Sequence, residues 1–460
     1  MKKIFFLILT ILNTNFLSSQ ERIIKNLYGF GTNTTFMFND IKDTSFLSNV
    51  NTISPRLLAF PGGLGNFYHL SGMGYGIKIS EVDLFHKGKL PKRIRGINKI
   101  IEKNKHKNYI YPFIDLSKKL KSDVIIDANI LSAEIDETIQ MINLILKNGI
   151  NVSFVEIGRE LTNQSYHENF DIYKYLEKSK VLTERIRITF PEIKIGVVAA
   201  PIYKSYVKHV NWNKLLSKEN FYDAIVVHTY AKVTKGKDEY GKMVTEYPEG
   251  KNKYQAFNIY KKRSLDFFKN YPKEINDYSQ MFQNKDIWIT EWNLQVSKLT
   301  GKTHIQSLFV FCYLMEVACN EELRKINLMS FHNLAGRDIS SSVIINREKS
   351  SLSTTFAAFK LLSDIFVNDK ITVVSRSFTN ELFEYEFHSE KNEKFFVCIN
   401  WSEQPKKVDI SEYDYSKIYY SENLYDNQYY KENFSSDEVN LKELEIPKYS
   451  FCIFKSGKNK

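Results

Sequence analysis

Eight short runs of apolar and β-branched residues recur along the chain, and they constrain its fold more than any other feature. Runs such as 195–198 and 225–227 are apolar without interruption, which is typical of parallel strands buried on both faces. Helical patterns separate most of the runs, for example at 135–147, 173–189 and 303–320. The eight runs are 27–32, 56–60, 123–128, 152–158, 193–200, 223–230, 286–292 and 326–332. This alternation predicts an α/β fold, a (β/α)8 barrel over residues 20–365.

A doubly wound open sheet is the rival architecture for the same alternation of strands and helices. Such sheets often bind dinucleotides through a G-x-G-x-x-G turn that opens a helix after the first strand. No such turn follows 27–32 in this sequence. The barrel is therefore the favoured interpretation of this part of the chain.

The pattern changes after Phe366. Short alternating runs separated by polar turns replace the helical periodicity, at 371–378, 382–387, 395–400, 417–420 and 450–455. Alternation with period two is typical of antiparallel strands with one buried face. We expect an antiparallel β-sandwich domain over residues 366–460, packed on the barrel.

The first 19 residues have the pattern of a secretory signal peptide. Lys2 and Lys3 precede an apolar run at 4–12, and the small residues Ser18 and Ser19 come just before Gln20. The run is too short for a membrane span, and no later stretch reaches the roughly 18 apolar residues that one needs. We therefore expect an exported protein, secreted or periplasmic.

The charge and the cysteines exclude several functions. Lys and Arg number 64 against 53 Asp and Glu, but the basic residues are scattered among acidic ones, unlike the concentrated stripe of a nucleic-acid-binding protein. Four cysteines are too few for a disulfide scaffold. Cys312 and Cys319 are expected to be buried thiols, while Cys398 and Cys452 could pair if their strands are neighbours. No C-x-x-C or H-x-x-x-H spacing indicates a metal, so no metal or other cofactor is expected.

Two of the eight predicted strands lead into a glutamate at their carboxyl ends, where barrel enzymes place their reacting side chains. The fourth strand runs through Glu156 to Arg159-Glu160, and the seventh ends Thr290-Glu291-Trp292-Asn293. Cleavage of a glycosidic bond requires two carboxyl groups, one that protonates the leaving oxygen and one that attacks the anomeric carbon. The pair on strands four and seven therefore indicates this chemistry more specifically than a single glutamate would.

These segments resemble the clan A retaining glycoside hydrolases, in particular the α-L-arabinofuranosidase, β-xylosidase and β-glucuronidase/heparanase-like branch. Phe60-Pro61-Gly62-Gly63 on strand two and the pair His228, Tyr230 on strand six match further motifs of that clan. The resemblance implies a barrel with a trailing sandwich, Glu160 as the acid/base and Glu291 as the nucleophile. It also implies a carbohydrate substrate, which we expect to be a plant or algal polysaccharide or its oligosaccharides.

The sequence departs from the clan at two positions. Arg159 stands where an asparagine that bonds the sugar usually precedes the acid/base, and Ala59 stands where an arginine is usual on strand two. We interpret the two changes as one guanidinium that has moved between strands, with decay of the active site as the alternative. On this interpretation we expect Arg159 either to pair with Glu291 or to bind an anionic group on the sugar. An anionic glycan is accordingly one candidate substrate.

Other polar residues near the strand ends are candidates for binding substrate. They are His228, Tyr230, Trp292, Asn293, His332 and Asn66, with Trp292 as an aromatic platform for a sugar ring. Glu156 shares a strand face with Glu160 and is expected to be structural, entering the barrel and holding Arg159.

The sequence thus favours an exported retaining hydrolase that works by double displacement. The alternative is a catalytically inactive carbohydrate-binding barrel whose active site has drifted, and the changes at Ala59 and Arg159 motivate it. Neither the sugar and its linkage, nor exo or endo action, nor the oligomeric state follows from the sequence.

Overall fold

A computed structural model describes residues 20–456 apart from short stretches. These are 64, 87–94, 97–98, 100–101, 103–107, 164–165, 167, 204–205, 238–242, 245–251, 339–341, 347–349 and 439–441. The expected signal peptide lies outside the described residues, as does much of the loop between 231 and 253. The described part of that loop contains a small hairpin, β8 (Gly236–Lys237) and β9 (Met243–Val244).

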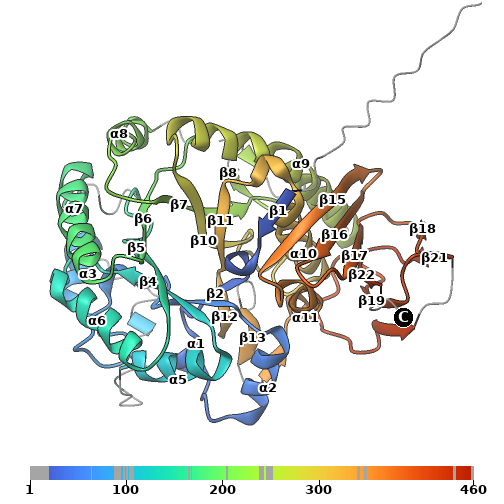
Figure 1. Cartoon of the computed structure of the whole chain (residues 1–460), viewed down its shortest axis with the longest axis horizontal. Helices are drawn as coiled ribbons and strands as arrows, with labels where there is room; N and C mark the ends of the chain where they lie inside the picture. Colours follow the sequence, from blue (N-terminus) through green and yellow to red (C-terminus); the bar gives the residue numbers. More distant parts are fainter. Residues whose placement is uncertain are drawn as a thin grey trace, which may run out of the picture.

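Eight parallel strands close into a barrel, in the order β10-β11-β2-β3-β4-β5-β6-β7 (Figure 1). Each coincides with one of the predicted runs, so the predicted barrel is confirmed. The strands are β2 (Gly29–Gly31), β3 (Leu57–Phe60), β4 (Asp123–Ala128), β5 (Val152–Ile157), β6 (Lys194–Val198), β7 (Ala224–Ala231), β10 (Asp286–Leu294) and β11 (Ile326–Phe331).

Helices cover the outside of the barrel, and the three predicted from periodicity lie within one residue of their predicted ends. These are α6 (Ile135–Lys147), α7 (Ile172–Thr189) and α10 (His304–Cys319). The other described helices are α1 (Thr35–Phe38), α2 (Thr44–Ile53), α3 (Ile79–His86), α5 (Ile110–Leu120), α8 (Val207–Leu216), α9 (Lys253–Met281) and α11 (Thr354–Phe366). Three short strands, β12 (Asn333–Gly336), β13 (Ser342–Asn346) and β14 (Ser350–Leu352), extend the loop after β11.

The inside of the barrel below the site is a small apolar core. It contains Trp288 of β10 together with aliphatic residues of β3, β4, β7 and β11. Gly196 of β6 makes room for the indole, because a Cβ at this position would lie 2.4 Å from the ring. The interior is therefore filled with side chains, and the polar residues of the site lie above this core, at the carboxyl ends of the strands.

The C-terminal residues form a seven-stranded antiparallel sheet in the order β1-β15-β16-β17-β22-β19-β20. Its strands are β1 (Gln20–Ile23), β15 (Lys370–Thr379), β16 (Leu382–Ser389), β17 (Lys394–Asn400), β19 (Tyr415–Tyr420), β20 (Phe434–Glu438) and β22 (Ser450–Lys455). A ribbon of β18 (Lys406–Asp409) and β21 (Glu443–Ile446) packs on it through Val408 and Ile446. The predicted sandwich is confirmed, but β1 pairs with β15, so residues 20–23 belong to this sheet and not to the barrel.

The four cysteines are buried free thiols. Cys398 of β17 and Cys452 of β22 are direct cross-strand partners, so their strands are neighbours as the sequence allowed, and no disulfide joins the two thiols in this structure. None of the described helices combines the length and the apolar character needed to cross a membrane.

Candidate active site

The chain leaves β5 through a tight bend that presents Arg159 and Glu160. Gly158 and Glu160 both adopt positive φ angles, 73° and 46°, and this region is unfavourable for a glutamate. Arg159 is buried, whereas the Glu160 side chain is 50% exposed. Backbone outliers of this kind tend to occur at functional sites, and here the bend turns Glu160 into the cleft.

A bulge in β10 orients Glu291. Ile289 pairs with Val227 of β7, but the next partner of β7, His228, pairs with Glu291, so Thr290 is an extra residue. The bulge changes which side chains face inward, so that Trp288 and Glu291 both point into the barrel although they are three residues apart. The Glu291 side chain is 11% exposed, next to a cleft that Glu160, His228 and Tyr230 line.

Glu160 and Glu291 face each other across the cleft, with His228 beside them. One carboxylate oxygen of each glutamate and one ring nitrogen of His228 all lie within 4.8 Å of one another. His228 Nδ1 is 3.1 Å from Glu160 Oε1, and Asn163 Nδ2 donates to Glu160 Oε2 at 2.9 Å. Carboxyl groups about 5–5.5 Å apart are the spacing found in retaining glycosidases.

Arg159 lies beneath the two glutamates and pairs with three carboxylates. Its Nη2 donates to Glu291 Oε2 at 3.0 Å, while its Nη1 lies 2.9 Å from Asp127 Oδ2 and 3.5 Å from Glu156 Oε2. Asp127 and Glu156 are fully buried, at the ends of β4 and β5. The expected pairing of Arg159 with Glu291 is therefore present, as is the expected structural position of Glu156.

Tyr230 and His332 complete the surroundings of Glu291. The Tyr230 hydroxyl donates to Glu291 Oε1 and also contacts His332 Nδ1, which lies 3.4 Å from the same carboxylate oxygen. Burial, together with the neighbouring Glu291 charge, raises the pKa of Tyr230 well above its usual value, so the phenol keeps its proton. Glu291 thus receives hydrogen bonds on both oxygens, which fixes its orientation.

The charges in the site keep Glu291 ionised. Burial alone would raise the pKa of Glu291, but the positive charges of His332, His228 and Arg159 hold it well below its usual range. Burial opposes protonation of His228, yet its contacts with Glu156 and Glu160 raise the pKa of that imidazole to about 10. Desolvation and Glu291 oppose ionisation of Glu160, but the hydrogen bond from His228 lowers its pKa.

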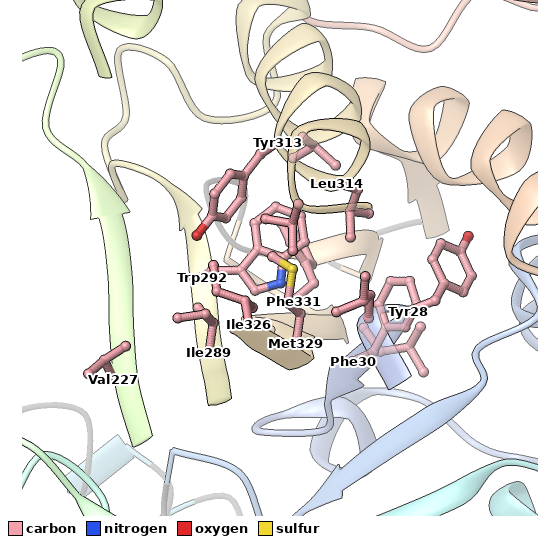
Figure 2. Packing of buried hydrophobic residues seen from close by; sticks show 14 of the residues in the cluster. Tyr28, Phe30, Val227, Ile289, Trp292, Tyr313, Leu314, Ile326, Met329 and Phe331 are labelled. Atoms are coloured by element: carbon pink, nitrogen blue, oxygen red, sulfur yellow. The ribbon is translucent and has the colours of Figure 1, made fainter. Parts of the chain in front are cut away.

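The structure contradicts the predicted roles of Trp292 and Asn293. Adjacent residues of a strand face opposite sides, so Trp292 points outward when Glu291 points inward. Its ring is 1% exposed and packs edge-on against Tyr313 of α10 and Phe331 of β11 (Figure 2). Asn293 is fully buried and accepts a hydrogen bond from Gln306 of α10. Neither side chain is placed to contact a sugar.

Asn66 also has a different role from the predicted one. Its amide exchanges two hydrogen bonds with the backbone of Arg159, from Nδ2 to the carbonyl oxygen at 2.6 Å and from the Arg159 N–H to Oδ1 at 2.8 Å. Asn66 therefore fixes the bend after β5. Arg159 itself is buried under the cleft with its guanidinium on protein carboxylates, so the structure favours the first of its two expected roles, the pairing with Glu291, over contact with an anionic sugar.

Asp127 and Asn163 take part in the site although the sequence analysis missed them. Asp127 ends the apolar run 124–126, and an acidic residue at that point of a buried strand is the signal that could have identified it. Burial raises the pKa of Asp127 well above its usual value, and the adjacent Glu156 adds to this against the pull of Arg159. Asn163 lies in the loop after Glu160, where no periodicity indicates its direction.

The cluster of Glu160, His228 and Glu291 has ligand atoms close enough together to hold a metal ion. The surrounding charges oppose this, because His228 holds a proton up to about pH 10 and Arg159 already neutralises Glu291. A divalent cation would have to displace that proton and would be repelled by the guanidinium. The arrangement instead suits proton transfer and nucleophilic attack.

Trp292 offers a direct test of its corrected position. We expect Trp292→Ala to destabilise the protein by about 3–5 kcal/mol, because it leaves a cavity between the barrel and α10. The milder Trp292→Phe should keep the KM of the wild type. Thermal denaturation and substrate kinetics measure the two effects. A stable Trp292→Phe variant with a strongly raised KM would contradict the corrected position.

Comparison with known proteins finds the same fold. No family model matches the sequence, and no curated protein matches it. Among solved structures, the GH51 arabinofuranosidase from Xanthomonas axonopodis pv. citri matches with a TM-score of 0.67 at 12% identity, over 95% of this chain and 97% of that one.

Two further solved structures agree with this. The α-L-arabinofuranosidase from Thermotoga maritima, in complex with arabinose, matches with a TM-score of 0.63 at 16% identity, over 95% of this chain and 97% of that one. The GH30 xylanase C catalytic domain from Talaromyces cellulolyticus matches with a TM-score of 0.55 at 11% identity, over 96% and 98%. The chain therefore has the barrel-and-sandwich fold of clan A glycoside hydrolases.

Proposed function

We propose that this protein is a retaining glycoside hydrolase in which Glu291 is the nucleophile and Glu160 the acid/base. The observation that carries the proposal is the pair of carboxyl groups facing one another across the cleft, with oxygens within 4.8 Å. The fold shared with the neighbouring structures also supports it. Fold alone does not specify a reaction, but this site has the geometry that a retaining glycosidase requires.

The two glutamates differ in the way that double displacement requires. Glu291 is ionised and held by Arg159 and Tyr230, so one of its oxygens can attack the anomeric carbon. Glu160 is half exposed, on the side where the leaving group departs. It gives a proton to the glycosidic oxygen in the first step and removes one from water in the second, when the bond to Glu291 breaks.

We assign the leaving group to a cavity of about 200 Å³ beside Glu160. Its lining also includes Asn163, Tyr230, Lys232 and Glu274 of α9. Because the solved neighbours are described as arabinofuranosidases and xylanases, we propose pentose-containing plant or algal glycans as the first substrates to test. With Arg159 occupied by carboxylates, an anionic sugar has no support from this residue.

A catalytically inactive carbohydrate-binding barrel is the alternative, and it was motivated by Arg159 and Ala59. The pairing of Arg159 with Glu291 argues against decay, because the relocated guanidinium supplies a cation to the nucleophile. A set of aryl α-L-arabinofuranosides and β-xylosides tests the choice, with the anomer of the first product followed by NMR. Hydrolysis with retention supports the enzyme. Binding of oligosaccharides without turnover of any member of the set favours the alternative.

Replacement of Glu160 by alanine gives the sharpest test of the acid/base assignment. With a poor leaving group, we expect Glu160→Ala to lower kcat by about 10²–10⁴-fold, because no proton reaches the departing oxygen. With a dinitrophenyl glycoside, whose leaving group departs without a proton, the second step limits turnover in this variant. Added azide should then restore kcat and yield a glycosyl azide of retained configuration, since a small anion fits the vacated place. If azide has no effect and the loss is the same for good and poor leaving groups, Glu160 is not the acid/base.

We also propose that the chain is exported and cleaved before Gln20, on the pattern of its first 19 residues. Expression of the full chain with mass analysis of the exported product tests this. A protein retained in the cell with Met1 in place would refute it.

A further inference from the structure

His228 lies between the exposed glutamate and a buried one. Its Nδ1 is 3.1 Å from Glu160 Oε1, and its Nε2 lies 3.8 Å from Glu156 Oε1 and 3.3 Å from Thr290 Oγ1. Only 10% of the imidazole is exposed, against none of the Glu156 side chain and half of Glu160. A ring with a carboxylate hydrogen-bonded to Nδ1 and a second carboxylate at ion-pair distance from Nε2 is most stable as the imidazolium, whose two N–H groups can donate to Glu160 and to the Thr290 hydroxyl.

Glu160 accepts hydrogen bonds on both of its oxygens in this arrangement. Oε1 receives the His228 Nδ1–H, and Oε2 receives the amide of Asn163 at 2.9 Å. In the free site Glu160 is thus a carboxylate, although the first step of the proposed reaction needs a carboxylic acid. Of these two donors only the His228 imidazolium is acidic enough to give up its proton, which lies at the other end of a single hydrogen bond.

We propose that His228 stores the proton that Glu160 delivers to the leaving group, which makes it a positioning residue that acts through Glu160. This inference rests on the proposed function. When substrate fills the cleft and removes water from Glu160, the proton moves from Nδ1 to Oε1 and leaves a neutral imidazole and a carboxylic acid. The charge pair becomes a neutral pair, which desolvation favours.

The proton balance closes over one turnover. Glu160 gives the proton to the glycosidic oxygen as that C–O bond breaks and the Glu291–sugar bond forms. In the second half, Glu160 removes a proton from the attacking water while the Glu291–sugar bond breaks. That proton returns to His228 Nδ1 once the product leaves and water re-enters. One water is consumed, and the site regains its imidazolium and two carboxylates.

The groups facing His228 determine the pH range of this device. Glu156 and Glu160 from β5 and its following bend favour the imidazolium, as does Glu291 from β10, while Arg159 opposes it. The raised pKa of His228, about 10, means that its proton is present at lower pH and is lost as the pH rises through that value. The alkaline limb of kcat/KM should therefore lie near pH 10, far above the range of a lone carboxyl.

His228→Asn tests the proposal, because asparagine can keep a hydrogen bond to Glu160 but cannot store a proton. With a phenyl glycoside we expect kcat/KM at pH 7 to fall by about 10²-fold, within the range of general acid catalysis. With a dinitrophenyl glycoside, whose leaving group needs no proton, the loss should be within about threefold. The alkaline limb for the phenyl glycoside should move to about pH 5–7, where a single tuned carboxyl titrates.

His388→Asn is the matched control, because His388 is a half-buried histidine of β16 in the C-terminal sheet. This substitution should change neither limb of the pH profile of kcat/KM. Equal losses of His228→Asn on both leaving groups, or an unmoved alkaline limb, would overturn the proposal. If the wild type cleaves no glycoside, the proposed function fails instead, so the two failures are distinguishable.

A measurement on the unsubstituted His228 covers the case in which His228→Asn does not fold. In protein labelled with ¹⁵N at histidine, both ring nitrogens of His228 should carry protons at pH 8 and one should be lost only near pH 10. The signal is assigned by its shift in Glu160→Gln, which removes one partner. A His228 ring that is neutral at pH 8 would overturn the proposal.

Discussion

Glu291→Gln is expected to lower kcat by at least about a thousandfold on every substrate the wild type cleaves, whatever its leaving group. The amide has no ionised oxygen to attack the anomeric carbon, so the covalent intermediate cannot form. The loss in stability should be small, because glutamine has the same size, its single oxygen can accept from Arg159, and its amide N–H can donate to the Tyr230 hydroxyl. Steady-state kinetics and thermal denaturation measure the two quantities.

A 2-fluoro glycoside distinguishes this explanation from a general loss of fit. In the wild type it should leave a sugar on the peptide that contains Glu291, and in Glu291→Gln it should leave none. Glu384→Gln is the matched control, a half-buried glutamate of β16 hydrogen-bonded to Ser377, and it should react like the wild type. A labelled peptide from elsewhere in the chain, or undiminished turnover in Glu291→Gln, would refute the assignment.

The sequence predicted the barrel because burial determines it locally. A strand such as 225–227, covered on both faces, must be apolar throughout, and this leaves a signal that periodicity detects. The pairing of β1 with β15 leaves no comparable signal. The four residues 20–23 are too few to show a period, and their partners lie some 350 positions away, so only the folded chain brings them together.

The site was predictable where strand ends determine it and unpredictable where side-chain direction does. Glu160, His228, Tyr230, Glu291, His332 and Arg159 do converge at the carboxyl ends of the strands. Trp292 was misplaced because an aromatic residue next to a nucleophile resembles a sugar platform, whereas alternation along the strand turns it outward. Asp127 was missed because its importance arises from Arg159, which reaches it from another strand.

Arg159→Ala is expected to lower both activity and stability, for the same physical reason. The substitution leaves Asp127 and Glu156 fully buried without their cation, and breaking a buried pair in this way costs about 3–5 kcal/mol. It also removes a hydrogen bond and a positive charge from Glu291, so we expect kcat/KM to fall by about 10²–10³-fold. Arg159→Lys is the control. It keeps the charge but cannot reach three carboxylates at once. Its activity and stability should therefore lie between those of the wild type and of Arg159→Ala.

The pH dependence of stability shows whether the buried carboxylates cause the loss. In the wild type, burial raises the pKa of Glu156 but the charges of Arg159 and His228 outweigh it and lower that pKa. In Arg159→Ala less positive charge opposes the effect of burial, so the pKa of Glu156 in the folded state should rise above its value in the unfolded state. A group raised in this way stabilises the fold below its unfolded pKa and loses that contribution as the pH rises. The difference in Tm between wild type and variant should therefore be larger at pH 8 than at pH 5. A difference that is constant over this range would mean that lost packing of the guanidinium, and not uncompensated charge, destabilises the variant.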